Sequence, residues 1–478
     1  MRKKGKAKEG IYTLNRDVLY DLVKSWTITE GTLYTTDSIL SWIKERNDTV
    51  GVDIKKIGLS SSQSWFYDEL NGTIHNQNNS FFSIFGFKKT LSDGCVISQP
   101  MIRQEEIGFL GILCKKIDGI LYFLMQAKIE PGNINNIQIS PTIQATKSNF
   151  TQKHGGAKPP YLEFFKNADQ YEIIVDQIQS EQSSRFYKKR NRNIMICVDK
   201  DVPVLPSHRW MTLGQVKSLM RIDNLVNMDT RTVLSCIPFY KLGLTQEEQV
   251  SLSRHFTDRA LFRSVFLSQP QNFIPNIYHF INDYKMFQEE KEEVVPLNEL
   301  KDWRMTDCSI ECKRPYPYRV IYCDIAIEGR EVKQWTQPLF EAMGIATFGL
   351  ICSEQDGVLK FLVRATSELG CFDGLELGPT VQREAVPMPD HKETEIDRFF
   401  FERLAQGKGV FFDHLLSEEG GRFYHEQNRN VLMQINIGEI PQLPKGYFWV
   451  DYRTLNELVQ VNNTLNIQLR NLISLLEA

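Results

Sequence analysis

The sequence predicts an α+β protein built as a tandem duplication of one module, a mixed β-sheet flanked by helices. The segment 126–150 (QAKIEPGNINNIQISPTIQATKSNF) recurs about 238 positions later as 364–388 (RATSELGCFDGLELGPTVQREAVPM). Each half also shows runs of alternating apolar residues between amphipathic helices. Because the likeness continues through both halves, the repeating unit is a whole domain, far longer than the unit of a solenoid.

Corresponding residues keep the same order through both halves of the chain. They include Trp65 and Trp303, Gln99 and Gln337, Ser180–Glu181 and Ser417–Glu418, Arg185 and Arg422, and Arg231 and Arg470. We therefore expect an N-terminal module over residues 1–240 and a C-terminal module over residues 241–478, with the boundary between the copies near 240–270.

Each module is expected to begin with an amphipathic helix, at 38–46 and at 276–285, where apolar residues recur at helical spacing. In the first module, strand patterns follow at 81–87, 108–114, 121–128 and 137–139. Asp118–Gly119 and Asp356–Gly357 lie between alternating apolar runs. They predict tight hairpins, because glycine supplies the positive φ that such turns need.

Further patterns complete the modules. We expect a helix at 161–165, another segment at 175–180, a strand at 193–198, and closing helical regions at 212–236 and 454–476. Between the copies, 251–266 has a helical pattern. The Glu-rich segment 288–295 predicts a solvated loop or a helix end.

Composition and charge are those of an ordinary globular protein of 478 residues. A net charge of −3 gives no reason to expect nucleic-acid binding. The basic segment 2–8 is expected to fray, and no apolar run approaches the ~18 residues that span a bilayer, so a cytoplasmic enzyme is the default. The nine cysteines lack C-x-x-C spacing, which predicts reduced thiols and no metal site.

The two copies differ in their polar and ionisable residues, which suggests a division of labour. Lys128 and Asn133 of the first copy align with Thr366 and Cys371 of the second. Because such groups become fewer in the second copy, we expect any chemistry to occur in the first.

The loop at 130–154 is rich in amides and hydroxyls. Gln138 and Ser140 alternate with apolar residues, and Gln144 and Thr146 continue the polar face. Such a face suits a sugar, whose hydroxyls each need a donor and an acceptor. A surface-exposed strand edge is the alternative interpretation.

Four ionisable residues are candidates for chemistry. Lys128, at the end of an apolar strand, could stabilise an enolate oxygen, although it could also be an extended surface lysine. His154 could act as a general base or acid, with a plain surface histidine as the alternative. Tyr161 is a second candidate acid. Glu130 is shared with Glu368, which favours a binding or structural role.

A basic cluster, RFYKKRNRN, contains Arg185, Arg190 and Arg192. Guanidinium groups bind phosphate oxygens in pairs, so a diphosphate is a natural ligand. A solvated basic turn is the alternative. The second copy retains RFYHEQNRN with less charge.

Several of these blocks resemble one family. QAKIEPGN, QISPTIQATKSN, the stretch from QSEQ to KKRNRN, and NMDTRTVL at 227–234 are similar to the NDP-hexose 2,3-dehydratases of deoxysugar biosynthesis. The resemblance implies a cofactor-free elimination on a nucleotide-linked 4-keto-6-deoxyhexose, usually carried on dTDP. The C3 proton is removed, the C2 hydroxyl leaves, and a 3,4-diketo-2,6-dideoxy sugar results.

The resemblance also implies paired Nudix-like modules, a homodimer, and transfer of the product to a 3-ketoreductase. The Nudix box is missing from both copies, so diphosphate hydrolysis is not expected. The expected catalytic residues are Lys128, His154, Tyr161 and Glu130. The expected substrate-binding residues are Gln126, Asn133, Gln138, Gln144, Thr146, Asn149, Arg185, Arg190 and Arg192. The second module would bind nucleotide or support the fold, and a non-catalytic sugar-nucleotide-binding protein is the alternative.

Overall fold

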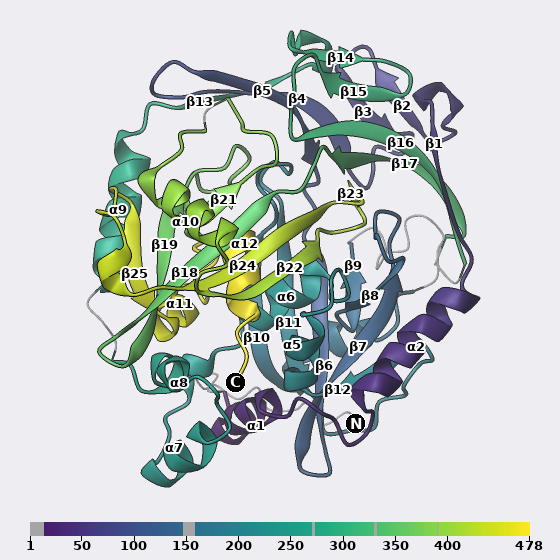
Figure 1. Cartoon of the computed structure of the whole chain (residues 1–478). Helices are drawn as coiled ribbons and strands as arrows, with labels where there is room; N and C mark the ends of the chain where they lie inside the picture. The colour runs from purple at the N-terminus through teal and green to yellow at the C-terminus, as the bar shows by residue number, and fades with distance from the viewer. Residues whose placement is uncertain (1–13, 147–157, 270–272, 329–331, 390) are drawn as a thin grey trace, which may run out of the picture.

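Two large sheets and two smaller ones organise the described part of the chain (Figure 1). The computed structural model describes residues 14–146, 158–269, 273–328, 332–389 and 391–478. The smaller sheets lie together at the top of the view, and the large sheets lie below them, one from each half of the sequence. This arrangement confirms the predicted α+β class.

The first half contributes its helices and strands in this order: α1 (Arg16–Trp26), α2 (Thr36–Thr49), β1 (Val52–Ile57), β2 (Trp65–Asp68), β3 (Thr73–Asn76), β4 (Ser83–Thr90), β5 (Val96–Arg103), β6 (Gly108–Ile117), β7 (Ile120–Ile129), β8 (Ile137–Ser140), β9 (Ile143–Ala145), α4 (Leu162–Lys166), β10 (Glu172–Ser180), β11 (Arg190–Cys197), β12 (His208–Met211), α5 (Leu213–Leu219) and α6 (Met228–Ser235).

Two helices, α7 (Gln246–Ser253) and α8 (Arg259–Phe266), connect the halves. The second half then contains α9 (Phe273–Phe287), β13 (Lys291–Val295), β14 (Trp303–Met305), β15 (Ser309–Cys312), β16 (Tyr318–Ile327), β17 (Gln334–Ala342), β18 (Thr347–Gln355), β19 (Val358–Thr366), β20 (Glu376–Gly378), β21 (Val381–Arg383), α10 (Glu395–Ala405), β22 (Val410–Ser417), β23 (Phe423–Tyr424), β24 (Gln427–Gln434), β25 (Tyr447–Asp451), α11 (Tyr452–Leu458) and α12 (Ile467–Ser474).

The two large sheets share one topology, as a duplication requires. In the first half the order is β10-β11-β6-β7-β12, and the second half repeats it as β22-β24-β18-β19-β25. In both, one inner pair is parallel, β11 with β6 and β24 with β18. The predicted hairpins are present, since Asp118 and Gly119 have φ of 48° and 81°, and Asp356 and Gly357 have φ of 51° and 76°.

The halves exchange one strand in each direction. Strand β1 of the first half pairs with β16 of the second, from Val52 opposite Ile327 to Ile57 opposite Tyr322. Strand β13 of the second half pairs with β4 of the first. The expectation of a solvated loop or helix end at 288–295 is therefore wrong for 291–295. The charged residues there form an edge strand, where one face remains in solvent and tolerates charge.

Three predicted helical regions are each divided in two, and one of them, 454–476, contains most of α11 and all of α12. The closing region 212–236 forms α5 and α6, because Asn224 adopts φ of 58° between them and Asn227 caps the new helix by accepting a hydrogen bond from Thr230 N. The region 251–266 contains the end of α7 and all of α8, which Asp258 caps. The local apolar pattern was correct, but it did not reveal the turns.

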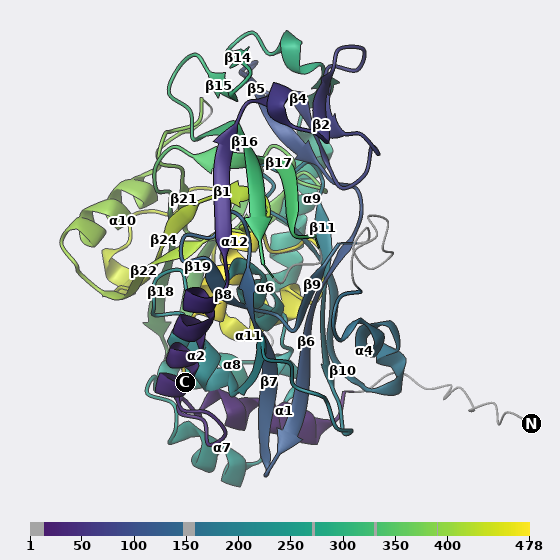
Figure 2. The same cartoon turned by 90° about the vertical axis from the view of Figure 1, so that its right-hand side faces the viewer.

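Helices α6 and α12 pack against each other in the middle of the molecule (Figures 1 and 2). Each carries one fully buried arginine that reaches the opposite half. Arg231 of α6 donates to the backbone oxygen of Ser417, and Arg470 of α12 donates to that of Ser180. Each buried guanidinium is thus hydrogen-bonded to a carbonyl oxygen of the other repeat.

Glycines allow the halves to approach closely at two corresponding turns. Gly132 N donates to Gly420 O at 2.7 Å, and a Cβ at Gly132 would lie 1.6 Å from Phe423 O. Gly370 N donates to Ser183 O at 2.8 Å in the equivalent place. A side chain at either glycine would separate the two backbones.

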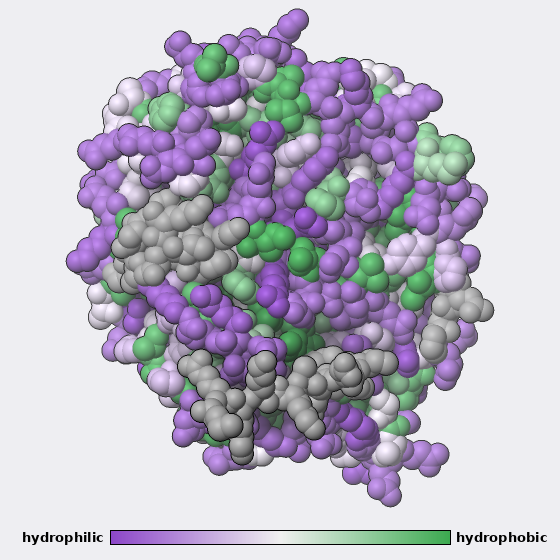
Figure 3. All heavy atoms as spheres, turned by 180° about the vertical axis from the view of Figure 1, so that it is seen from behind, coloured by the Kyte–Doolittle hydropathy of each residue, from purple (hydrophilic) through white to green (hydrophobic). Residues whose placement is uncertain are grey.

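The surface carries scattered rather than continuous apolar groups on the face in Figure 3. Among the described helices, none combines the length and hydropathy needed to cross a bilayer. The nine cysteines are all free thiols, as the sequence predicted.

Replacing Arg470 with leucine tests the buried hydrogen bonds between the halves. We expect Arg470→Leu to lower the free energy of unfolding by about 3 kcal/mol, because buried carbonyl groups of Ser180 and Leu465 lose their donor. Arg221→Leu is the control, since Arg221 forms a half-exposed ion pair with Glu477 and should change stability by less than about 1 kcal/mol. Denaturant unfolding measures both, and equal losses would contradict the interpretation.

Candidate functional site

A cavity of about 360 Å³ opens between the large sheet of the first half and parts of the second half. The first half supplies strands β6, β7 and β9, the segments around β2 and β3, the connection between β10 and β11, and the first turn of α6. The second half supplies β17 and the segment 419–422. The cavity therefore needs both repeats.

Lys128 reaches the cavity from the end of β7. Its neighbours Ala127 and Ile129 are buried in the hydrophobic core, and strand alternation directs Lys128 to the other face. The Lys128 side chain is only 10% exposed, and its Nζ lies 3.0 Å from Oε1 of Glu130. The ion pair compensates a charge that would be costly to bury alone.

A line of side chains holds Glu130 in place. Gln144 donates from Nε2 to Glu130 Oε1 at 3.1 Å, and Asn227 donates from Nδ2 to Gln144 Oε1 at 3.3 Å. Asn227 is also the N-cap of α6. The position of the Lys128 ammonium is thereby coupled to the start of that helix.

Glu181 and Lys189 lie on the connection between β10 and β11. Asn191 donates to Glu181 Oε2 at 2.6 Å, whereas Oε1 is buried with no hydrogen-bond partner among the described residues. Burial raises the pKa of Glu181 to about 7, against the nearby charges of Lys189 and Arg470. Burial also lowers the pKa of Lys189 to about 8, and Glu181 opposes that shift.

Arg422 and Glu419 bring charge from the second half. Arg422 donates to Gly421 O at 2.7 Å and to Gln104 Oε1 at 3.0 Å, and its guanidinium lies 4.3 Å from the ring centre of Phe81. Burial lowers the pKa of Arg422 and raises that of Glu419 to about 8. The cavity thus contains a buried cation with an aromatic ring beside it.

The charged lining is nearly balanced. Its described cations are Lys128, Lys189 and Arg422, and its described acids are Glu130, Glu181, Asp229 and Glu419. Trp65, Phe81, Phe109 and Trp335 add aromatic surface. Such a cavity can hold an anion and also move protons.

Four of the residues predicted from sequence meet at this cavity: Lys128, Glu130, Gln144 and Thr146. His154 and Asn149 lie outside the described residues. Tyr161 is not part of the described lining, since its hydroxyl donates to Pro203 O at 2.8 Å and accepts from Leu205 N at 3.1 Å.

Other predicted binding residues form structural contacts away from the lining. Gln126 lies on β7 opposite Ser140, and Asn133 donates to Asn136 O at 2.9 Å. Gln138 is fully buried and donates to Ser417 Oγ at 2.6 Å, because β8 faces the second half rather than a ligand. The polar strand face therefore contacts protein at Gln138.

The predicted arginine cluster does not converge on the cavity. Arg192 forms two hydrogen bonds of 2.6 Å with Asp176. Arg190 lies over Phe372, 3.7 Å from the ring centre. Arg185 pairs with Glu384 at 3.1 Å and is 1% exposed. Arg185 and Arg192 thus pair with acids, whereas Arg190 contacts an aromatic ring.

At the equivalent position of the second half, the corresponding side chains form an ion pair. Glu384 occupies the place of Thr146, and its longer side chain pairs with Arg185, the counterpart of Arg422. Lys128 is replaced by Thr366, and Asp229 by Gln468. Glu368 still accepts from Gln382 at 2.8 Å, as Glu130 does from Gln144. The framework is retained, while the charges that line the first cavity are changed.

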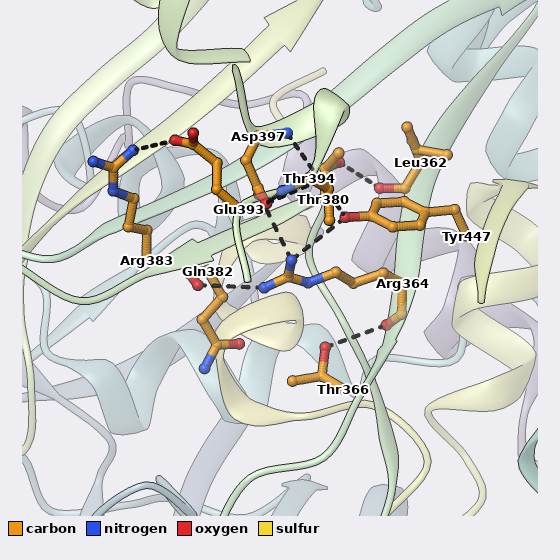
Figure 4. Close-up of polar contacts among 10 residues, drawn as sticks. All are labelled: Leu362, Arg364, Thr366, Thr380, Gln382, Arg383, Glu393, Thr394, Asp397 and Tyr447. Atoms are coloured by element: carbon orange, nitrogen blue, oxygen red, sulfur yellow. Dashed lines mark hydrogen bonds and ion pairs between the residues drawn. The ribbon is translucent and has the colours of Figure 1, made fainter. Parts of the chain in front are cut away.

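Figure 4 shows how the second half uses Arg364, which replaces Gln126. The guanidinium lies 3.6 Å from Asp397, 3.4 Å from the Tyr447 hydroxyl and 3.3 Å from the Gln382 backbone oxygen. Arg364 thereby links β19 to β21, α10 and β25. In this half the position has a structural role.

Sequence reasoning missed several residues of the lining, notably Glu181, Asp229, Glu419 and Arg422. Glu181 and Arg422 were recognised only as repeated positions. Asp229 lies within NMDTRTVL and differs between the copies, so a position-by-position comparison could have identified it. The contribution of Glu419 depends on contact between the halves, and no local pattern indicates that contact.

Known proteins are similar in sequence to this chain over most of its length. A sequence model of the NDP-hexose 2,3-dehydratase family matches residues 36–237 and again 275–476. The chain belongs to that family. The two matched regions correspond to the two repeats, and they include every described residue that lines the cavity.

Relatives within the family support the same assignment. A dTDP-4-dehydro-6-deoxy-alpha-D-glucopyranose 2,3-dehydratase from Saccharopolyspora spinosa is 37% identical over 91% of this chain and 90% of its own length. Proteins of the same name from Amycolatopsis orientalis and Streptomyces violaceoruber are each 33% identical. They cover 94% and 91% of this chain, and 92% and 95% of their own lengths.

Proposed function

We propose that the cavity dehydrates a nucleotide-linked 4-keto-6-deoxyhexose across C2 and C3, with dTDP as the nucleotide. The observation that carries the proposal is the buried Lys128–Glu130 pair facing a cavity lined with acids, in a member of the NDP-hexose 2,3-dehydratase family. The cavity volume of about 360 Å³ is within the range of small-molecule sites.

Lys128 stabilises the charge that develops on the substrate. Removal of the C3 proton delocalises negative charge onto the C4 oxygen. An ammonium fixed by Glu130 at 3.0 Å is already oriented and partly desolvated, so it interacts strongly with that oxygen. The elimination then expels the C2 hydroxyl as water, and the resulting enol tautomerises to the 3,4-diketone.

Glu181 is the described group best suited to accept the C3 proton. Asn191 holds one carboxylate oxygen and leaves Oε1 without a partner among the described side chains. With a pKa of about 7, Glu181 is ionised above neutral pH and remains basic enough to accept a proton. His154, predicted for proton transfer, stays a prediction.

Arg422 and Lys189 are suited to the diphosphate. Among the described cations of the lining, these two form no side-chain ion pair like that of Lys128 with Glu130. A guanidinium can bind two phosphate oxygens at once. The aromatic lining offers a stacking surface for the nucleotide base. The first module would then supply the chemistry, and the second would supply part of the binding site.

Finer features of the family resemblance remain proposals for this chain. The two mixed sheets with flanking helices are consistent with Nudix-like modules. A homodimer, a cytoplasmic location and transfer of the product to a 3-ketoreductase remain predictions.

Incubation with dTDP-4-keto-6-deoxyglucose tests the proposal. Together with a 3-ketoreductase and its reductant, the protein should form a product that has lost the C2 oxygen, detected by mass analysis. Lys128→Met should lower kcat by about 10²–10³-fold, as expected for loss of a charge that stabilises an oxyanion. Lys116→Met, on the exposed part of β6, should have little effect. Binding without turnover in the wild-type protein would favour the non-catalytic alternative.

A glutamate at position 146 should close the cavity. In the second half, Glu384 stands at the equivalent position and pairs with Arg185. We expect Thr146→Glu to pair with Arg422 and to weaken dTDP binding at least tenfold, or about 1.4 kcal/mol. Isothermal titration calorimetry measures the change. Thr146→Gln separates charge from size and should weaken binding less. Unchanged binding by Thr146→Glu would contradict the role of Arg422.

The pH dependence of kcat/KM should report Glu181. Because the carboxylate must be ionised to accept a proton, kcat/KM should fall as the pH drops below about 7. Glu181 faces Lys189, Arg470 and Glu418, so this value depends on their charges. Glu181→Gln should reduce kcat/KM by about 10²–10⁴-fold and remove this acidic limb. If Glu181→Gln keeps residual activity with the same fall below pH 7, the acidic limb belongs to a group other than Glu181.

A further inference from the structure

We infer that Asp229 is the acid that protonates the departing C2 hydroxyl. The inference rests on the proposed function and extends it, because neither the family match nor the sequence patterns assign a role to this residue. Elimination of an unprotonated hydroxyl would release hydroxide, a poor leaving group, so a positioned proton donor is needed.

Asp229 is placed by the start of α6. Asn227 caps the helix by accepting from Thr230 N at 2.9 Å, and Asp229 follows within the first turn. Its side chain lines the cavity although the residue is only 1% exposed. A carboxyl group so placed can contact a bound substrate while solvent is excluded.

One oxygen of the Asp229 carboxyl group has no hydrogen-bond partner among the described residues. Its Oδ2 is buried without a hydrogen bond, whereas the other acids of the first half's lining are anchored, Glu130 by Gln144 and Glu181 by Asn191. A buried polar atom without a hydrogen-bond partner is costly unless a ligand or water supplies the hydrogen bond. A substrate hydroxyl in the cavity would form a hydrogen bond with this oxygen of Asp229.

Burial and the charges around Asp229 favour its protonated form. Burial raises the pKa of Asp229 well above its ordinary value, and the carboxylates of Glu181, Glu419 and Glu130 add to the shift, against Lys128. A helix N-terminus favours an anion, but here burial and the neighbouring acids prevail. This shift favours the protonated form of Asp229, which is the form able to donate a proton.

Comparison of the repeats separates this role from a structural one. Helix α12 has the same cap, with Asn466 accepting from Leu469 N at 2.9 Å, but it carries Gln468 where α6 carries Asp229. An amide is thus compatible with this helix and its packing. The carboxyl group occurs in the half whose sheet forms the cavity.

The proton balance is complete. Glu181 takes the proton from C3, the C3–H electron pair forms the C2–C3 double bond through the enolate, and the C2–O bond breaks. Asp229 gives its proton to the leaving oxygen, so that water departs. Asp229 is left as a carboxylate and Glu181 as an acid, and exchange with solvent restores both.

Asp229→Asn, compared with the wild-type protein on two substrates, tests the inference. The substrates are dTDP-4-keto-6-deoxyglucose and its 2-deoxy-2-fluoro analogue, whose fluoride leaves without full protonation. We expect Asp229→Asn to slow loss of water by about 10²–10⁴-fold and fluoride release by less than about tenfold. Exchange of the C3 proton with D₂O, followed by NMR in recovered substrate, should persist. Gln468→Asn is the matched control and should behave as the wild-type protein.

Each other outcome has a definite meaning. Equal losses with both substrates, loss of C3 exchange, or undiminished dehydration would overturn the assignment of Asp229 and leave the proposed function intact. A wild-type protein that neither dehydrates the sugar nor releases fluoride would overturn the proposed function and this inference with it.

Discussion

The structure depends on buried hydrogen bonds that each half donates to the other. Arg231 and Arg470 are fully buried, and each donates to a backbone oxygen of the opposite repeat. Removing either partner would leave a charge or a carbonyl without compensation inside the protein. The exchanged strands β1 and β13 reinforce the same dependence. Neither half can be described as a complete unit, and the cavity lies where the two meet.

One framework borders a cavity in the first half and holds an ion pair at the equivalent position of the second. The hydrogen bond from glutamine to glutamate is present in both, as Gln144 to Glu130 and Gln382 to Glu368. In the first copy, Thr146 and Arg422 both line the cavity. In the second copy, Glu384 replaces the threonine and pairs with Arg185, the counterpart of Arg422. The two copies thus differ at this position in side-chain length and charge.

Burial also explains the electrostatics of the cavity. Glu181 and Glu419 have pKa values raised to about 7 and 8, and the pKa of Lys189 is lowered to about 8. These groups can change protonation near neutral pH because water is largely excluded and no single opposite charge dominates. The same exclusion that makes the acids costly to bury makes them suitable for proton transfer.

The sequence by itself determined the duplication, the α+β class and the hairpins at Asp118–Gly119 and Asp356–Gly357, because these follow from periodicity and glycine conformation. It also singled out Lys128, because charge is rare in apolar strands, and the structure places this lysine in the cavity lining. Only the tertiary structure decided which polar residues face the cavity. Gln138 and Arg185 form contacts between the halves instead of lining the cavity. Arg422 and Glu419 of the second repeat do line the cavity. Partners separated by more than two hundred residues leave no local pattern, since their contact exists only once the two sheets pack together.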